Sequence, residues 1–106
     1  MSEEISVDDL KRRRDAGEEL VLLDVREPDE LRTASISWAS WIPMREVPAR
    51  MHELPRDKPL VVMCHHGGRS ERVTQFLQAN GYDNAINLAG GIDAWSVTID
   101  PNVPRY

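Results

Sequence analysis

The sequence predicts an α/β protein with a largely parallel sheet, because apolar segments of strand type alternate with segments of helical periodicity. Three apolar runs, 19–25, 59–63 and 84–88, have the length and composition of buried strands. Between the last two, Val73, Phe76 and Leu77 form the apolar stripe of a helix over 70–80, and Gly81 marks its end. Strands separated by helices in this way favour parallel pairing.

The remaining elements are shorter and rest on local capping and turn signals. The first helix is predicted from Val7 to Ala16, with Ser6 as its N-cap and Gly17 as its stop. The other expected elements are a short helix over 28–32, a short strand over 40–43, a short helix from Pro48 to about Leu54, and a short helix after Gly90 and Gly91 that carries Trp95.

The length and composition indicate one globular domain spanning residues 1–106. Hydrophobic residues make up 41% of the 106 residues and charged residues 29%, which is an ordinary globular composition. The longest apolar run, Leu20 to Leu23, is far shorter than the ~20 residues that a membrane helix needs. The acidic N-terminus is unlike a signal peptide, and a lone cysteine suits a reducing compartment, so we expect a cytoplasmic protein without a membrane partner.

The charge balance argues against nucleic acid as a partner. Eighteen acidic residues outweigh thirteen basic ones, for a net charge of -5, whereas binding to phosphates needs a basic surface. The one basic run, Lys11 to Arg14, falls at the end of the first predicted helix, where positive charge complements the helix dipole. We therefore interpret this run as a solvated helix end.

The only cysteine, Cys64, follows the second predicted strand and precedes a helix, in the stretch VVMCHHGGRSERV. In open α/β sheets, ligands bind at the carboxyl ends of the strands. A helix N-terminus and successive backbone amides favour a thiolate there, and Arg69 adds a positive charge. Gly67 and Gly68 are expected to supply dihedral angles that other residues resist. Although a lone cysteine is often a core residue, the polar neighbours indicate an exposed, reactive sulfur.

These residues bring the chain close to a known family. The segments CHHGGRS, LLDVREPDE, NLAGGIDAW and DPNVPRY together resemble the rhodanese family of sulfurtransferases, in the family's order and spacing from Ile5 to Tyr106. The resemblance implies a rhodanese-like α/β fold, with a five-stranded, mostly parallel sheet and helices on both faces. It also implies that Cys64 accepts a sulfane sulfur as a persulfide, which the backbone amides of Cys64 to Arg69 surround.

Two other chemistries fit the loop less well. Cysteine phosphatases of the related cell-cycle type need one residue more than the four that separate Cys64 from Arg69, so a phosphatase is a remote alternative. A metal site is weaker still, because Cys64, His65 and His66 are adjacent and are expected to point in divergent directions, and no second ligand pair has zinc-like spacing. We therefore predict no metal ligands.

The residues around Cys64 have roles that the sequence defines less well. His65 and His66 either add positive charge and hydrogen bonds for an anionic donor or simply line an exposed loop, and both interpretations stay open. Asp24 and Arg26 follow the first predicted strand at the same sheet edge, where we expect an ion pair or loop hydrogen bonds that hold the site. Ser70 is expected to cap the following helix. The active loop thus comprises His65, His66, Gly67, Gly68, Arg69 and Ser70 beside Cys64.

The chain departs from the family pattern after REPDE. Family members usually continue with a segment resembling Gly-His-Ile-x-Gly-Ala, whereas here residues 34–39 read ASISWA. The large apolar side chains that follow are interpreted as core. The alternative is an apolar patch for self-association, formed by Ile36, Trp38 and Trp41.

The resemblance implies a two-step exchange that needs no cofactor. The thiolate of Cys64 attacks the outer sulfur of a donor such as thiosulfate and releases sulfite, and an acceptor, cyanide or a thiol, then takes the sulfur from the persulfide. The alternative is a carrier or interaction domain that hands its persulfide to a protein partner.

Overall fold

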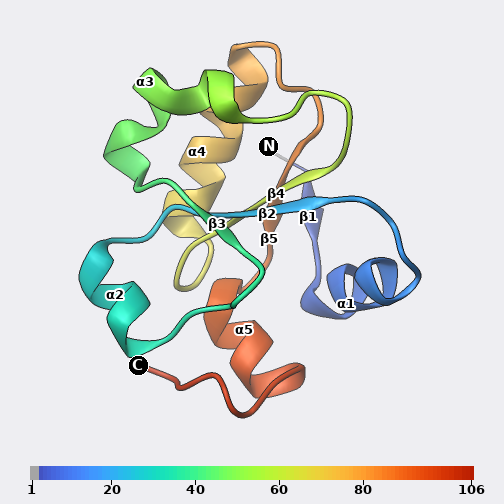
Figure 1. Ribbon diagram of the computed structural model, residues 1–106, viewed down its shortest axis with the longest axis vertical. Helices are drawn as coiled ribbons and strands as arrows, with labels where there is room; N and C mark the ends of the chain where they lie inside the picture. Colours follow the sequence, from blue (N-terminus) through green and yellow to red (C-terminus); the bar gives the residue numbers. More distant parts are fainter. Residues whose placement is uncertain (1–2) are drawn as a thin grey trace.

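The computed structural model describes residues 3–106 and places a five-stranded sheet between two layers of helices (Figure 1). The strand order is β1-β5-β4-β2-β3, and every neighbouring pair is parallel. The strands are β1 (Glu4–Ile5), β2 (Val21–Asp24), β3 (Ser40–Trp41), β4 (Leu60–Met63) and β5 (Ala85–Leu88). The predicted α/β class and the parallel sheet are confirmed.

The helices lie at the positions where the periodic segments and turn signals predict them. They are α1 (Val7–Asp15), α2 (Pro28–Thr33), α3 (Val47–Arg50), α4 (Gly68–Ala79) and α5 (Gly91–Thr98), with the 3₁₀ turns η1 (Met44–Glu46) and η2 (Met51–Glu53) on either side of α3. The side chain of Ser6 accepts a hydrogen bond from the Asp9 amide at 3.1 Å, so the predicted N-cap of α1 is present.

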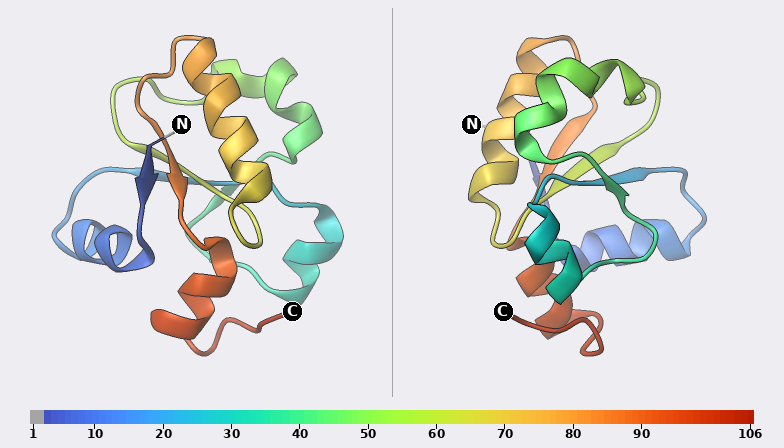
Figure 2. Two further views of the ribbon diagram at one scale, coloured as in Figure 1. Left: turned by 180° about the vertical axis from the view of Figure 1, so that it is seen from behind. Right: turned by 60° about the vertical axis from the view of Figure 1, so that its left-hand side comes forward.

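The alternation of side chains along the strands produces two cores. In β4, Val61 and Met63 face one apolar cluster, while Leu60 and Val62 face the other. The first cluster lies under α1 and α5, and the second lies under α3 and α4. Figure 2 shows these two helix pairs on opposite sides of the sheet. Because both faces are covered, the central strands are apolar throughout, which explains their continuous apolar runs.

Several boundaries differ from the predicted ones. Strand β1 was not predicted, because two residues are too short to show a strand pattern and Glu4 and Ile5 are defined only by their pairing with β5. Helix α4 begins at Gly68 rather than at Ser70, because the chain turns into the helix directly after the positive-φ residue Gly67. Strand β3 ends at Trp41, so the predicted strand over 40–43 is too long.

The apolar patch considered for self-association does not form. Ile36 is buried in the core and is only 6% exposed. Trp38 is half-buried, contacts Trp95 edge to face at 5.9 Å between ring centroids, and is covered by the Arg14 guanidinium at 4.1 Å. Trp41 is exposed, but its Nε1 donates a hydrogen bond to the Arg26 carbonyl at 2.8 Å. The core interpretation therefore holds for Ile42, which is buried, and for Trp38, which packs against the core, but it is wrong for Trp41.

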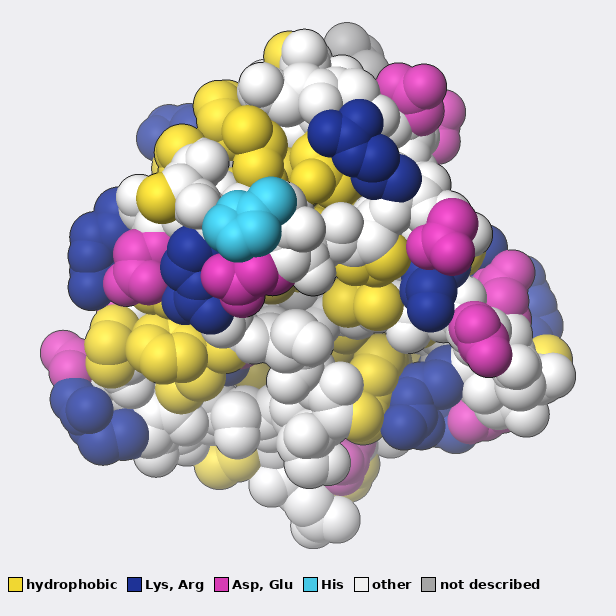
Figure 3. Space-filling view, turned by 45° about the horizontal axis from the view of Figure 1, so that its top comes forward, with side chains coloured by type: hydrophobic (Ala, Val, Ile, Leu, Met, Phe, Trp, Pro, Cys, Tyr) yellow, Lys and Arg dark blue, Asp and Glu magenta, His cyan; other side chains and the backbone are white. Residues whose placement is uncertain are grey.

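The surface shows no concentration of one charge on the face drawn in Figure 3, where basic and acidic side chains lie side by side. Many charged side chains of the described residues form ion pairs with partners close in the sequence, such as Arg50 with Glu46 and Glu53. Within residues 3–106, no helix combines the length and the apolar character that a membrane span requires.

Candidate active site

Cys64 lies at the carboxyl edge of the sheet, directly after β4. The chain then passes through His65, His66 and Gly67 and enters α4 at Gly68. Because β4 has a paired strand on each side, this loop leaves the centre of the sheet. The predicted position of the thiol, between a central strand and a helix N-terminus, is confirmed.

The sulfur atom of Cys64 accepts hydrogen bonds from the loop and from the first turn of α4. The amide of Gly67 donates to Sγ at 3.0 Å, and the hydroxyl of Ser70 lies 3.3 Å from it. Burial acts to raise the pKa of the thiol, but the hydrogen bonds from Ser70 and Gly67, together with the charge of Arg69, outweigh burial and lower the pKa. The site therefore favours a thiolate.

The sulfur is not exposed, contrary to the expectation from its polar neighbours. Cys64 is only 1% exposed and packs in the apolar cluster under α4, which includes Val25 and Val73. The cysteine side chain lies against the first turn of α4, where Sγ is 3.3 Å from the Ser70 hydroxyl. A donor from solution therefore reaches Sγ only when the loop or the segment over it moves.

Ser70 contacts the sulfur instead of capping α4. Its side chain is fully buried, and its hydroxyl lies 2.5 Å from Asn87 Oδ1 and 3.2 Å from the Gly67 carbonyl as well as near Sγ. A hydroxyl has one proton and serves one acceptor at a time. Since a charged acceptor forms the stronger hydrogen bond, formation of the thiolate favours rotation of this proton toward Sγ.

The N-terminus of α5 holds the other side of the loop. The amides of Ile92 and Asp93 donate to the carbonyls of Cys64 and His65 at 3.0 and 3.1 Å. This close approach requires Gly91, whose φ is +59° and where a Cβ atom would lie 2.5 Å from both carbonyl oxygens. The segment NLAGGIDAW therefore supports the loop through its backbone.

Arg69 is not a free positive charge. Its two terminal nitrogens contact the Glu30 carboxylate at 2.6 and 2.8 Å, and Glu30 is only 18% exposed. The hydroxyl of Tyr106 donates to the same carboxylate at 2.7 Å. Mainly through the bonds from Arg69, the pKa of Glu30 falls to about 2, so this carboxylate is ionised at neutral pH.

Asp24 and Arg26 form the ion pair that their positions predict. Arg26 Nη2 lies 2.7 Å from Asp24 Oδ2, and both side chains are buried. Arg26 also donates to the carbonyl of Ala34 at 2.9 Å and to the hydroxyl of Tyr106 at 2.9 Å. The buried pair thus links the end of β2 to the segment after α2 and to Tyr106.

The ring of His65 stacks between those of His66 and Tyr106, so the two histidines do not diverge as expected. The ring centroids of His65 lie 3.9 Å from those of His66 and 3.8 Å from those of Tyr106. Ligand atoms of His65, His66 and Asp93 lie within 4.8 Å of one another, which is close enough to hold a metal ion. The Asp93 carboxylate of this group is contacted by Arg105 at 2.9 Å, so a metal ion there would compete with that ion pair.

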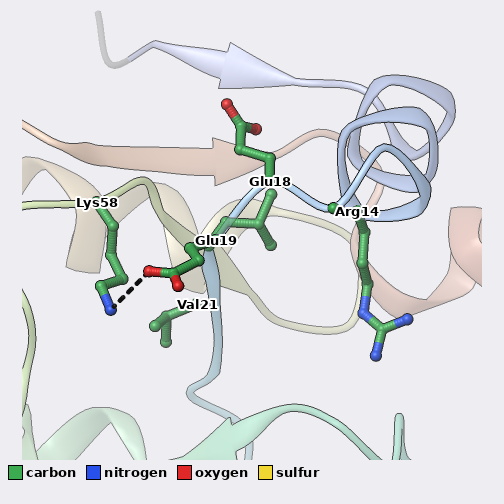
Figure 4. A pocket seen from close by; sticks show the side chains of 7 residues that line it. Arg14, Glu18, Glu19, Val21 and Lys58 are labelled. Carbon is green, nitrogen blue, oxygen red and sulfur yellow. Dashed lines mark ion pairs between the residues drawn. The ribbon is translucent and has the colours of Figure 1, made fainter.

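A surface depression of about 520 Å³ lies at the opposite edge of the sheet from Cys64. It adjoins Val21 and Lys58, at the amino ends of β2 and β4. In Figure 4 the Lys58 ammonium points toward the Glu19 carboxylate, 3.8 Å away. Arg14, on the other side of this depression, covers the Trp38 ring. The depression is thus open and its charges have partners, and it is separate from the thiol.

Sequence reasoning missed three contributors to the site. Asn87 is a polar residue in a buried strand, which is itself a signal for an internal hydrogen bond. Glu30 stands where a capping box places a glutamate, and it does bond the Glu27 amide at 3.1 Å, but nothing local reveals its contact with Arg69. Tyr106 belongs to the quoted segment DPNVPRY, yet its place over the loop depends on the tertiary fold.

A cysteine held among backbone amides at the carboxyl edge of a parallel α/β sheet defines a class of protein with a nucleophilic thiol. Residues 6–98 match the model of the rhodanese-like domain. A sulfurtransferase of Allochromatium vinosum is 38% identical over 96 residues, which cover 91% of this chain and 90% of that protein. The chain belongs to the family of rhodanese-like domains.

Two further relatives extend the comparison. A rhodanese-related protein from Thermoplasma volcanium has a similar structure, with a TM-score of 0.80 and 36% identity over 96% of this chain and 95% of that one. YrkF of Bacillus subtilis, named as a proposed sulfur carrier protein, is 36% identical over 93 residues, which cover 88% of this chain and 50% of YrkF. The names of two of these three relatives thus refer to sulfur transfer or to sulfur carriage.

Proposed function

We propose that this protein is a sulfurtransferase that carries the transferred sulfur as a persulfide on Cys64. The observation that carries the proposal is the geometry of Sγ, which accepts hydrogen bonds from Gly67 and Ser70 and has a lowered pKa. A thiolate is the nucleophile that sulfur transfer requires. Family membership and the named sulfurtransferase relative support the same chemistry.

In the proposed reaction, the Cys64 thiolate attacks the outer sulfur of thiosulfate. The S–S bond of thiosulfate breaks, its electron pair leaves with sulfite, and Cys64 becomes a persulfide. A thiol, or cyanide in an assay, then attacks the outer sulfur and regenerates the thiolate. Both steps exchange one S–S or C–S bond for another, so they consume no external oxidant or reductant.

The single cysteine and this thiolate chemistry support a reducing, cytoplasmic location for the protein.

The test is a turnover assay with thiosulfate and cyanide that measures thiocyanate. The parent protein should turn over, and Cys64→Ser should form no thiocyanate above background. A serine variant as active as the parent would contradict the proposal.

The active-loop residues His65 and His66 have no assigned step, because His66 is exposed and His65 is held by stacking.

A second candidate is a persulfide carrier that delivers its sulfur to a protein partner. Two observations favour it: the burial of Cys64, which shields a persulfide from solution, and the similarity to a proposed sulfur carrier. A carrier loads quickly from a persulfide donor but forms little thiocyanate from thiosulfate and cyanide. A cysteine phosphatase stays a remote alternative, because the loop is one residue too short to encircle a phosphate.

A further inference from the structure

Three arginines around the active loop each contact a carboxylate. Arg69 contacts Glu30, Arg105 contacts Asp93, and Arg26 contacts Asp24, in each case with an N···O distance below 3 Å. These pairs come from different elements: Arg69 lies on α4, Glu30 on α2, and Arg105 follows α5. The loop therefore offers an incoming anion fewer unbalanced positive charges than its arginines suggest.

The pair between Arg69 and Glu30 is the one that includes a residue of the active loop. Arg69 acts directly on the Cys64 thiolate through its charge. Glu30 is held against that guanidinium by two hydrogen bonds and is fixed from the other side by the Tyr106 hydroxyl. The amide of Glu27, at the N-cap of α2, also donates a hydrogen bond to the Glu30 carboxylate. Glu30 is thus a negative charge held beside the positive charge that helps to lower the pKa of the thiol.

We propose that Glu30 selects the sulfur donor: by cancelling the charge of Arg69, it disfavours the dianion thiosulfate relative to less charged donors such as an alkyl persulfide. This inference rests on the proposed sulfur transfer through Cys64. With the persulfide donor, the thiolate attacks the outer sulfur of R–S–SH. The S–S bond breaks, its electron pair leaves on R–S⁻, and Cys64 becomes the persulfide with its proton retained on the outer sulfur.

Electrostatics gives the expected size of the effect. A unit charge about 6 Å from the site changes the local concentration of a monoanion roughly threefold in water, and that of a dianion by the square, roughly tenfold. A neutral reagent is unaffected by this charge except through the thiolate fraction. The ratio of the reaction rate of a charged reagent to that of a neutral one therefore reports the electrostatic potential at Cys64, because the reactivity of the thiol affects both rates equally.

The experiment compares four proteins: the parent, Glu30→Gln, Arg69→Gln and the double variant. Glutamine has the shape of glutamate but keeps only one of the two oxygens, which accept from Tyr106 and from the Glu27 amide respectively, so Glu30→Gln removes the charge and one of these two hydrogen bonds. For each protein, the rates of Cys64 alkylation by iodoacetate and by neutral iodoacetamide are measured, together with persulfide loading from thiosulfate and from hydroxyethyl persulfide. Glu53→Gln is the matched control, because it makes the same charge change in a remote pair with Arg50.

Glu30→Gln should raise the iodoacetate-to-iodoacetamide ratio roughly threefold and the thiosulfate-to-iodoacetamide ratio roughly tenfold. Arg69→Gln should lower both ratios, and the double variant should return them to within twofold of the parent. Glu53→Gln should change neither. If Glu30→Gln alone fails to fold, the double variant still decides the test. Rate ratios in the double variant as low as those of Arg69→Gln would show that Glu30 has no influence.

The failures of the two proposals are distinguishable. If the parent gains no sulfur on Cys64 from either donor, the proposed sulfur transfer is wrong. If the parent loads sulfur but the ratios of Glu30→Gln equal those of the parent, sulfur transfer stands and the donor-selecting role of Glu30 is overturned.

Discussion

The ring of Tyr106 lies face to face with that of His65, with 3.8 Å between centroids and 4° between the planes. The same side chain donates its hydroxyl to Glu30, which holds Arg69. Tyr106 therefore contacts the residue after Cys64 and, through Glu30, the arginine at the far end of the active loop. One side chain from the last segment of the chain thus braces both ends of the loop around a buried sulfur.

We predict that Tyr106 limits access to Cys64. Tyr106→Ala removes the stack and the hydrogen bonds and should speed alkylation by iodoacetamide several-fold, because loop opening becomes easier. Tyr106→Phe keeps the stack, so its alkylation rate should lie between those of the parent and Tyr106→Ala. The rates are measured well above the pKa of the thiol, so that the thiolate fraction is constant. Equal rates in all three proteins would show that this segment does not restrict access.

We predict that Ser70→Ala raises the pKa of Cys64, because a hydrogen bond that stabilises the thiolate is lost. The measurement is the pH dependence of iodoacetamide alkylation. The variant should also lose about 1–3 kcal/mol of stability, since Asn87 Oδ1 loses its buried partner. Thr74→Val is the control, because it removes a buried hydroxyl one turn away that bonds only the Ser70 carbonyl. An equal pKa in both variants contradicts the assigned role of Ser70.

The two loop glycines are predicted to differ in their tolerance of a side chain. Gly67 has a φ of +121° and donates its amide to Sγ, so Gly67→Ala should cost about 1–2 kcal/mol and raise the pKa of the thiol. Gly68 has helical dihedral angles and open space at its Cβ position, so Gly68→Ala should leave stability within about 1 kcal/mol of the parent. Chemical denaturation gives the free energy of unfolding of both variants. Equal values for Gly67→Ala and Gly68→Ala would contradict the prediction.

The pair between Glu30 and Arg69 should contribute to stability in a defined pH range. The pKa of Glu30 is about 2 in the folded protein, below its ordinary value of 4.5, so folding favours the ionised form. This contribution is complete above the unfolded pKa and is lost as the pH falls from about 4.5 toward 2. Denaturation curves between pH 7 and pH 3 should therefore show a smaller acid loss in Glu30→Gln than in the parent. Identical pH profiles would contradict the assigned ion pair.

The sequence predicted those parts of the fold that depend on local pattern. The apolar runs around Leu22, Val62 and Leu88 are buried strands of a parallel sheet, and Cys64 lies at its carboxyl edge. Strand β1 was not predictable, because its two residues are strand only through pairing with β5. The ion pair of Asp24 and Arg26 was predictable because both residues follow the same strand end.

The errors at the site arose where tertiary contacts override local character. Polar neighbours suggested an exposed sulfur, but the direction of the Cys64 side chain depends on the turn at Gly67, which places Sγ under α4. Arg69 was expected to add a positive charge to the loop, but its pairing with Glu30 was not predicted, since Glu30 lies far away in the sequence. Gly68 was expected to need unusual dihedral angles, but only Gly67 of the two has a positive φ.

The most direct test of the account is the intact mass of the protein after incubation with thiosulfate or hydroxyethyl persulfide and removal of the excess donor. The parent protein should gain the mass of one sulfur atom on Cys64, and treatment with cyanide should remove it with formation of thiocyanate. Cys64→Ser should gain nothing under the same conditions. The central claim is contradicted if neither donor adds sulfur to the parent, or if the serine variant gains and transfers sulfur as the parent does.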